Sequence, residues 1–111
     1  MKTVFLSRSD VVRRNDAYSN FAFDFEALVK QEKDAYERLS QHDKYDTGYI
    51  FVTEYEIQLP DDYDMKNKTA DRVYCEIFLG DVDCPQYDAL IGIFSDTSIV
   101  RQADLLGNGG R

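Results

Sequence analysis

The run YIFVTEYEIQL at residues 49–59 constrains the fold more than any other part of the chain, because it keeps a period of two over its whole length. Successive side chains of a β-strand point to opposite faces of a sheet, so this period predicts a long strand. One face of that strand would carry Tyr49, Phe51, Thr53, Tyr55, Ile57 and Leu59, and the other Ile50, Val52, Glu54, Glu56 and Gln58. A shorter run, KTVFLS at residues 2–7, is rich in β-branched and aromatic types and predicts a first strand.

Between these two runs the period changes to that of a helix. Apolar residues from Phe21 to Leu39 recur at spacings of three and four, which predicts one helix over residues 19–41. Ser19 or Asp16 would supply the oxygen that caps its first turn. Acid–base pairs four residues apart occupy the opposite side of this helix, so we expect that side to face water.

The second part of the chain shows three weaker patterns. Two further strands are predicted, at residues 71–79 (DRVYCEIFL) and at residues 89–95 (ALIGIFS). Residues 96–107 (DTSIVRQADLLG) predict a short helix. Thr97 or Ser98 would cap its first turn, and it would end at a glycine. We therefore expect an α+β fold, an antiparallel sheet of about four strands with one long helix packed across a face and a short C-terminal helix.

Length and composition favour one folded domain. A chain of 111 residues can bury roughly 65% of the surface that its unfolded form exposes, and its hydrophobic share of 43% exceeds that of disordered chains. We expect residues 1–107 to form a single compact domain and residues 108–111 a flexible tail. No apolar run approaches the roughly 20 residues that cross a bilayer, and the opening MKTVFLSRSD turns polar too early for a signal peptide. These features predict a cytoplasmic protein with no membrane partner.

The net charge of −8 is unevenly distributed. Residues 1–42 are neutral overall, whereas residues 43–104 hold fourteen acids and only five bases. An acidic surface repels nucleic-acid phosphates and attracts basic partners at rates that salt lowers. We therefore expect a basic protein surface as the partner and no direct binding of nucleic acid. Near the N-terminus, Arg8, Arg13 and Arg14 are expected to pair mainly with the protein's own carboxylates.

The sequence contains no recognisable motif for catalysis or for a cofactor. His42 is the only histidine, and neither Cys75 nor Cys84 has a cationic sequence neighbour that would stabilise a thiolate. Two loops rich in aspartate, at residues 60–71 and 80–88, offer oxygen ligands, but neither has the spacing of an EF-hand or its closing glutamate. We therefore predict no catalytic residue, no metal site and no cofactor.

An acidic stripe is predicted where the second and third strands pair. In an even register, Glu54, Glu56 and Glu76 share one face with Tyr74. Like charges placed opposite one another destabilise a sheet unless water screens them or a basic partner covers them. Aspartates of the two loops would extend this stripe, and tyrosines would add contact area. The predicted partner-binding residues are Glu54, Glu56, Asp61, Asp62, Tyr63, Asp64, Tyr74, Glu76, Asp81 and Asp83.

These features favour a small acidic protein-binding module, an inhibitor or adaptor that occupies a basic surface of its partner. We do not expect this protein to be an enzyme. By analogy of size and charge with anti-restriction and anti-CRISPR proteins of viruses and mobile elements, the partner would be a nucleic-acid-binding enzyme, and the mechanism partial mimicry of nucleic acid. DNA carries one charge per about 1.7 Å of axis, so a net charge of −8 is enough for one patch and not for a whole surface. Two alternatives remain open: a structural or assembly subunit, which would form a homo-oligomer, and a small divalent-metal-dependent enzyme.

Overall fold

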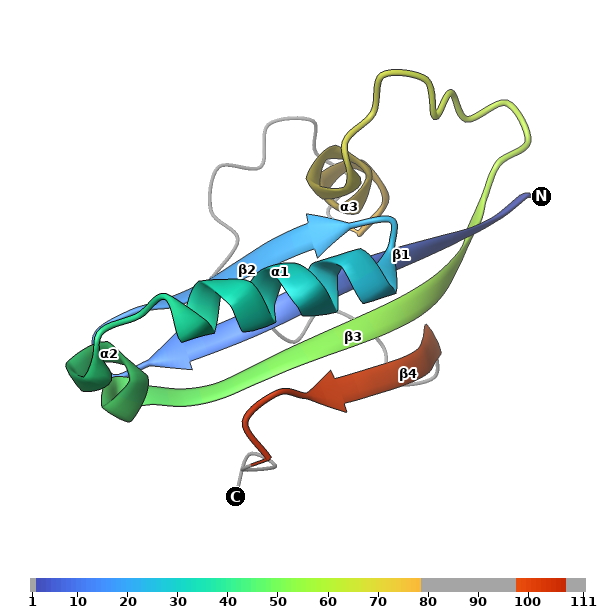
Figure 1. The fold of residues 1–111 in the computed structure, drawn as a ribbon. Helices are drawn as coiled ribbons and strands as arrows, with labels where there is room; N and C mark the ends of the chain where they lie inside the picture. The colour runs from blue at the N-terminus through green and yellow to red at the C-terminus, as the bar shows by residue number, and fades with distance from the viewer. Residues whose placement is uncertain (1, 79–97, 108–111) are drawn as a thin grey trace.

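The computed structural model describes residues 2–78 and 98–107, with a four-stranded sheet at its centre (Figure 1). The strands lie in the order β2-β1-β3-β4, and each neighbouring pair is antiparallel. The described elements are β1 (Lys2–Arg13), β2 (Ala17–Ala22), α1 (Phe25–Glu37), α2 (Gln41–Asp46), β3 (Thr47–Leu59), α3 (Ala70–Phe78) and β4 (Ile99–Asp104). The predicted α+β fold with one long helix across an antiparallel sheet is confirmed.

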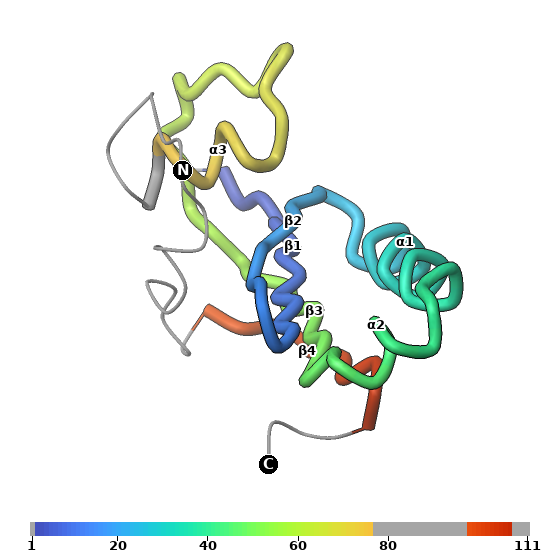
Figure 2. Tube along the Cα trace, turned by 90° about the vertical axis from the view of Figure 1, so that its left-hand side faces the viewer, coloured from blue at the N-terminus to red at the C-terminus, as the bar shows by residue number. Residues whose placement is uncertain are grey.

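The two faces of the sheet are covered by different helices, which lie on opposite sides of it in Figure 2. Val52 packs with Phe25 and Leu28 of α1, so its side of the sheet is called the α1 face. Leu6 and Tyr55, which are directly paired across β1 and β3, pack with α3 on the other side, called the α3 face. The alternation predicted for residues 49–59 therefore divides the side chains of β3 between the α1 face and the α3 face.

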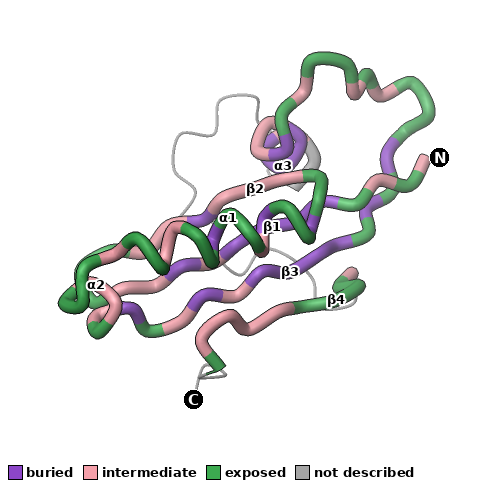
Figure 3. The backbone as a smooth tube through the Cα atoms, viewed as in Figure 1, coloured by how far each residue is buried: buried purple, intermediate pink, exposed green. Residues whose placement is uncertain are grey.

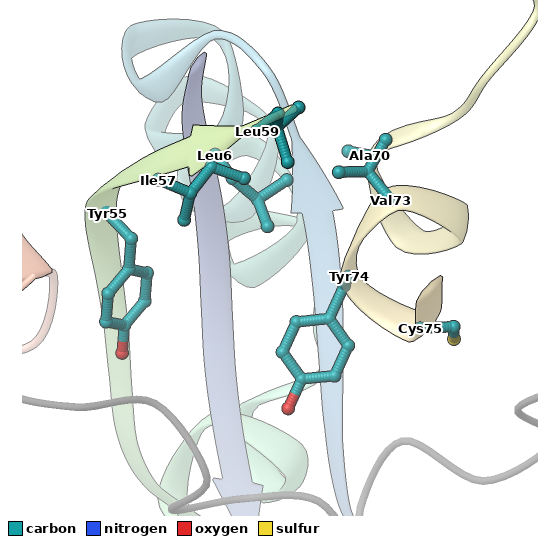
Figure 4. Close-up of a cluster of buried hydrophobic side chains, with 8 residues drawn as sticks. All are labelled: Leu6, Tyr55, Ile57, Leu59, Ala70, Val73, Tyr74 and Cys75. Atoms are coloured by element: carbon teal, nitrogen blue, oxygen red, sulfur yellow. The ribbon is translucent and has the colours of Figure 1, made fainter. Parts of the chain in front are cut away.

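The α3 face carries the larger core cluster (Figure 4). Its buried members come from the first half of β1, the second half of β3 and residues 70–75 of α3, and they are Leu6, Tyr55, Ile57, Leu59, Ala70, Val73, Tyr74 and Cys75. On the α1 face, Phe25, Leu28 and Val52 form the second cluster. Burial is concentrated along β1 and β3, as Figure 3 shows, because these two strands lie inside the sheet.

The long helix α1 begins later than its sequence pattern predicted. Residues 19–22, which the pattern placed in the helix, belong instead to β2, which runs back along β1 through a tight hairpin closed by Arg13 N donating to Asp16 O at 2.8 Å. The helix starts after Asp24, whose side chain accepts a hydrogen bond from Ala27 N at 3.1 Å, so the expected caps Ser19 and Asp16 do not serve. The first turn of the predicted helix does not form, because its residues pair with β1 along the whole of β2.

Phe21 explains why the helical period seemed to extend through this hairpin. It lies in β2 on the α3 face, with its ring centroid 4.7 Å from that of Tyr74. Its spacing from Phe25 and Leu28 fits a helix, but those two residues pack on the other side of the sheet. The apolar stripe therefore combined residues that belong to two faces.

The prediction of a strand at residues 71–79 is wrong, because residues 70–78 form the helix α3. Ala70, Val73 and Tyr74 are three and four positions apart, the spacing that places side chains on one side of a helix, and all three are buried. Apolar residues are dense in this segment, so a two-residue pattern (Val73 and Cys75) and a helical pattern were both present. Packing against Leu6 and Leu59 accounts for the helical form.

The predicted short C-terminal helix is also wrong in place, because residues 99–104 form β4. This strand pairs Arg101 with Glu54 and Ala103 with Val52, with an irregularity between Glu54 and Tyr55. It completes the ladder along the open side of β3, a partner that sequence periodicity cannot show. The strand predicted at residues 89–95 and the tail predicted at residues 108–111 lie outside the described residues.

Candidate functional site

The predicted acidic stripe does not form, because its glutamates lie on different sides of the molecule. Glu54 and Glu56 point to the α1 face of β3, whereas Glu76 belongs to α3, which packs on the opposite face. Since residues 70–78 are helical, they have no register with β3. Asp81 and Asp83 lie outside the described residues. The remaining predicted residues therefore divide into separate groups with separate environments.

Glu54 belongs to an ion-pair network that joins three elements. Arg101 of β4 donates from Nε to Glu54 Oε1 at 2.9 Å and from Nη1 to Glu26 Oε1 of α1, also at 2.9 Å. The guanidinium lies over the ring of Phe25 at 4.2 Å from its centroid, a cation–π contact. The hydrogen bond to Glu54 raises the pKa of Arg101. The charge of Glu54 is thus compensated inside the protein, and Arg101 links β4 both to β3 and to α1.

Glu76 is compensated in a second network, which ties the β3–α3 connection to α3. Its Oε1 accepts from the Tyr63 hydroxyl at 2.7 Å, and both of its carboxylate oxygens accept from Lys68 Nζ, at 2.6 and 2.8 Å. The hydrogen bond from Lys68, with that from Tyr63, lowers the pKa of Glu76. Burial, assisted by the bond to Glu76, raises the pKa of Tyr63 to about 12.

This second network predicts a difference in alkaline stability between the wild type and the Tyr63→Phe variant. The unfolded chain releases the Tyr63 proton near pH 10.0 and the folded chain near pH 12, so the free energy of unfolding falls as the pH rises through this window. The variant has no hydroxyl to ionise at position 63. The free energy of unfolding of the wild type minus that of the variant should therefore decrease from about pH 10 upward. Urea denaturation of both proteins at a series of alkaline pH values measures it. A difference that stays constant with pH would contradict the assignment.

Tyr74, another predicted contact residue, is buried and belongs to a polar centre on the α3 face. Arg8 is 2% exposed and donates from Nε to Asp10 Oδ1 at 2.8 Å and from Nη1 to the Tyr74 hydroxyl at 3.4 Å. Asp10 also accepts from Ser19 Oγ at 2.9 Å. The expectation that Arg8 pairs with the protein's own carboxylates is confirmed. Tyr74 therefore contributes to the core and does not present its ring on the surface.

The three predicted aspartates that remain exposed lie in the connection between β3 and α3, residues 60–69, called here the acidic loop. Asp61, Asp62 and Asp64 occupy three of four consecutive positions. The loop folds into turns: Tyr63 N donates to Pro60 O at 3.0 Å, and the carboxylate of Asp64 accepts from a backbone N–H at 2.8 Å. These carboxylates are therefore held on a defined local backbone.

Two contacts attach the acidic loop to the protein body. Tyr63 and Met65 pack against the core cluster of the α3 face, while Lys68 binds Glu76. The charge of Lys68 is thus used within the protein, and Lys66 is the base that the loop exposes beside its three exposed aspartates.

Glu56 lies apart from this loop, on a part of the α1 face that α1 does not bury. It is exposed, and across the ladder its partner Phe5 is 43% exposed. A shallow surface groove continues from Glu56 and Gln58 to Ile99 and Val100 at the start of β4. This surface therefore combines one carboxylate with exposed apolar side chains. Among the described contacts, Glu56 forms no ion pair.

Within residues 2–78 and 98–107, no group of three or more His, Cys, Asp or Glu side chains is placed to hold a metal ion. No helix among these residues is long and apolar enough to cross a membrane. The chain was compared with protein-family models, with curated proteins and with solved structures, and nothing matched in any of the three comparisons.

Proposed function

We propose that this protein is a protein-binding module whose acidic loop contacts a basic surface of a partner protein. The observation that carries the proposal is the exposure of Asp61, Asp62 and Asp64 on a loop that is attached to the core. Glu54 and Glu76, two further carboxylates of the predicted surface, are bonded internally and are not counted in this contact. The contact surface is therefore smaller than the stripe that the sequence predicted.

The attachment of the loop favours binding for an energetic reason. Ordering a flexible segment at an interface costs free energy, and a segment that is already held in its bound form avoids that cost. Tyr63 and Lys68, bonded to Glu76, together with Met65 against the core, hold the acidic loop before a partner arrives. Long-range attraction then adds to the association rate, because the chain has a net charge of −8.

The proposed class of partner is a nucleic-acid-binding enzyme, with the acidic loop in place of a short stretch of phosphates. One strand of DNA carries one phosphate per about 3.4 Å of helix axis. An extended chain advances at most about 3.6 Å per residue, so three aspartates in four positions reach a comparable number of charges per unit length. A groove that binds nucleic acid neutralises phosphates with lysines and arginines, so its basic surface would complement the loop.

Neutralising the acidic loop should abolish salt-sensitive capture of a basic partner from cell extract. The test variant is Asp61→Asn/Asp62→Asn/Asp64→Asn, which removes three charges and keeps side-chain size. The control variant Asp16→Asn/Asp34→Asn/Glu37→Gln removes three charges from exposed positions outside the acidic loop, in the turn after β1 and on α1. We expect the wild type and the control to retain a basic protein at about 0.1 M salt and to release it near 0.5 M.

The loop variant should retain little of that protein even at the lower salt concentration. Quantitative mass spectrometry of the eluted proteins measures the ratio among the three baits. Equal capture by the loop variant and the control variant would show that net charge, and not the acidic loop, attracts the partner. Capture that survives high salt in all three would contradict an electrostatic contact altogether.

A further inference from the structure

The strand β2 forms one edge of the sheet, and no described strand pairs with its outer side. Its backbone groups alternate between β1 and that outer side. Asn20 N donates toward β1, to Ser9 Oγ at 3.2 Å. Because neighbouring residues of a strand direct their N–H and C=O groups to opposite sides, those of Ala17 and Ser19 point outward. The edge therefore offers donors and acceptors at a spacing that another strand can match.

The two edge strands differ in the features that normally prevent a further strand from adding. Natural edges carry charged residues, prolines or bulges for this purpose. In β4, Arg101 and Asp104 are charged, and the ladder is irregular next to Tyr55. The sequence of β2, AYSNFA, has no charge and no proline, and its register with β1 is regular throughout. Of the two edge strands that the structure describes, β2 is the one that lacks these features and can therefore accept a further strand.

The outer side of β2 is also walled by the two main helices. A surface groove runs along Ser19, Asn20 and Phe21, and its walls include Gln31 of α1 and Asp71 of α3. Figure 2 shows these helices on opposite sides of the sheet, with β2 at the edge between them. Side chains of an added strand point alternately to the two faces, so one set would meet α1 and the other set would meet α3.

We propose that the edge of β2 binds an extended basic segment of the partner protein, which joins the sheet as an additional strand. This inference rests on the proposed function, because it identifies how the same partner is held. Charge decides the occupant: Asp71 lines the groove, and it lies two positions beyond the end of the acidic loop in the chain. A second copy of this chain would bring another net charge of −8 to the same place, which opposes self-pairing through β2.

The test uses a synthetic peptide of alternating lysine and valine, about six residues long as strands usually are. Hydrogen exchange of individual amides is followed by NMR in the intact protein, with and without the peptide. Without peptide, the outward amides of Ala17 and Ser19 should exchange much faster than the inward amide of Asn20. With free peptide at about ten times its Kd, exchange at the two outward amides should slow about tenfold.

Two controls separate strand addition from simple charge attraction. A peptide of the same sequence with N-methyl groups along one backbone edge keeps its charge and cannot pair on that edge, so it should give no protection. The variant Ser19→Pro removes the outward donor, whereas Ser19→Ala loses only the hydroxyl bond to Asp10. We expect Ser19→Ala to bind the peptide and Ser19→Pro to lose it.

Three results would overturn the inference. Slow exchange of Ala17 and Ser19 in the free protein would show that the edge is already paired, and a dependence of that protection on protein concentration would identify a second copy. Equal binding of the N-methylated peptide would leave charge as the sole attraction. Equal capture of the natural partner by Ser19→Pro and Ser19→Ala would reject strand addition, while the proposed function would stand or fall separately with the acidic-loop variant.

Discussion

Replacing Leu28 with alanine is expected to lower the free energy of unfolding by about 2–5 kcal/mol, the usual cost of removing a leucine from a core. Leu28 is 1% exposed and joins Phe25 and Val52 in the cluster that attaches α1 to the sheet. Three buried residues make up that cluster among the described ones, so few neighbours can fill the cavity. Urea denaturation followed by circular dichroism gives the difference between the two proteins.

Lys33→Ala is the matched control for this change. Lys33 lies on the same helix, is exposed, and is replaced by the residue with the highest helix propensity. We expect its urea midpoint to stay close to that of the wild type, because surface substitutions seldom change stability much. If Leu28→Ala behaved like Lys33→Ala, α1 would not be held to the sheet through this residue, and the described core of the α1 face would be wrong.

Removing the carboxylate of Asp10 should destabilise the protein by about 3–5 kcal/mol, the range for a buried ion pair that loses one partner. Arg8 is 2% exposed, so the Asp10→Ala variant keeps a guanidinium in the core without the carboxylate that accepts from its Nε at 2.8 Å. The Ser19 hydroxyl loses its acceptor in the same variant. The large cost arises from burial of a charge, not from the strength of the pair itself.

The double variant Arg8→Met/Asp10→Leu distinguishes these two sources of energy. Replacing both members of a buried pair by apolar residues removes the stranded charge, so the double variant should be more stable than Asp10→Ala alone. A double variant that is less stable, by the sum of both single changes, would show that the two residues act independently. The exposed pair Lys30–Asp34, at 2.8 Å on α1, serves as the control, and we expect little change from Asp34→Ala.

Local periodicity correctly predicted those elements whose hydrophobic pattern fits only one type of secondary structure. β3 alternates without interruption over residues 49–59, and both of its faces meet a helix, as the two sets of side chains required. In α3 and β4 the same reasoning failed. The segment from Ala70 to Cys75 fits two periods at once, and β4 depends on its long-range pairing with β3. Contacts distant in sequence, not intrinsic propensity, determine both.

The residues of the candidate site also fall into two groups: those whose environment could be predicted from the sequence and those whose environment could not. The aspartates at positions 61, 62 and 64 are exposed because a short turn places them there, and this could be expected from the sequence alone. Glu54 and Glu76 required knowledge of partners 47 and 8 residues away, Arg101 and Lys68. The pair Arg8 and Asp10 did leave a signal, since residues two apart in a strand share a face. Its burial depended on α3, which was predicted as a strand.

The most direct test of the proposed contact is cross-linking of the captured complex with a carbodiimide, which joins carboxylates to lysines without a spacer. We predict amide links from Asp61, Asp62 or Asp64 to lysines of the partner, and the loss of these links at about 0.5 M salt. Mass spectrometry of the digested complex identifies the joined residues. Links that arise instead from acids of α1, such as Asp34 and Glu37, would contradict a contact through the acidic loop.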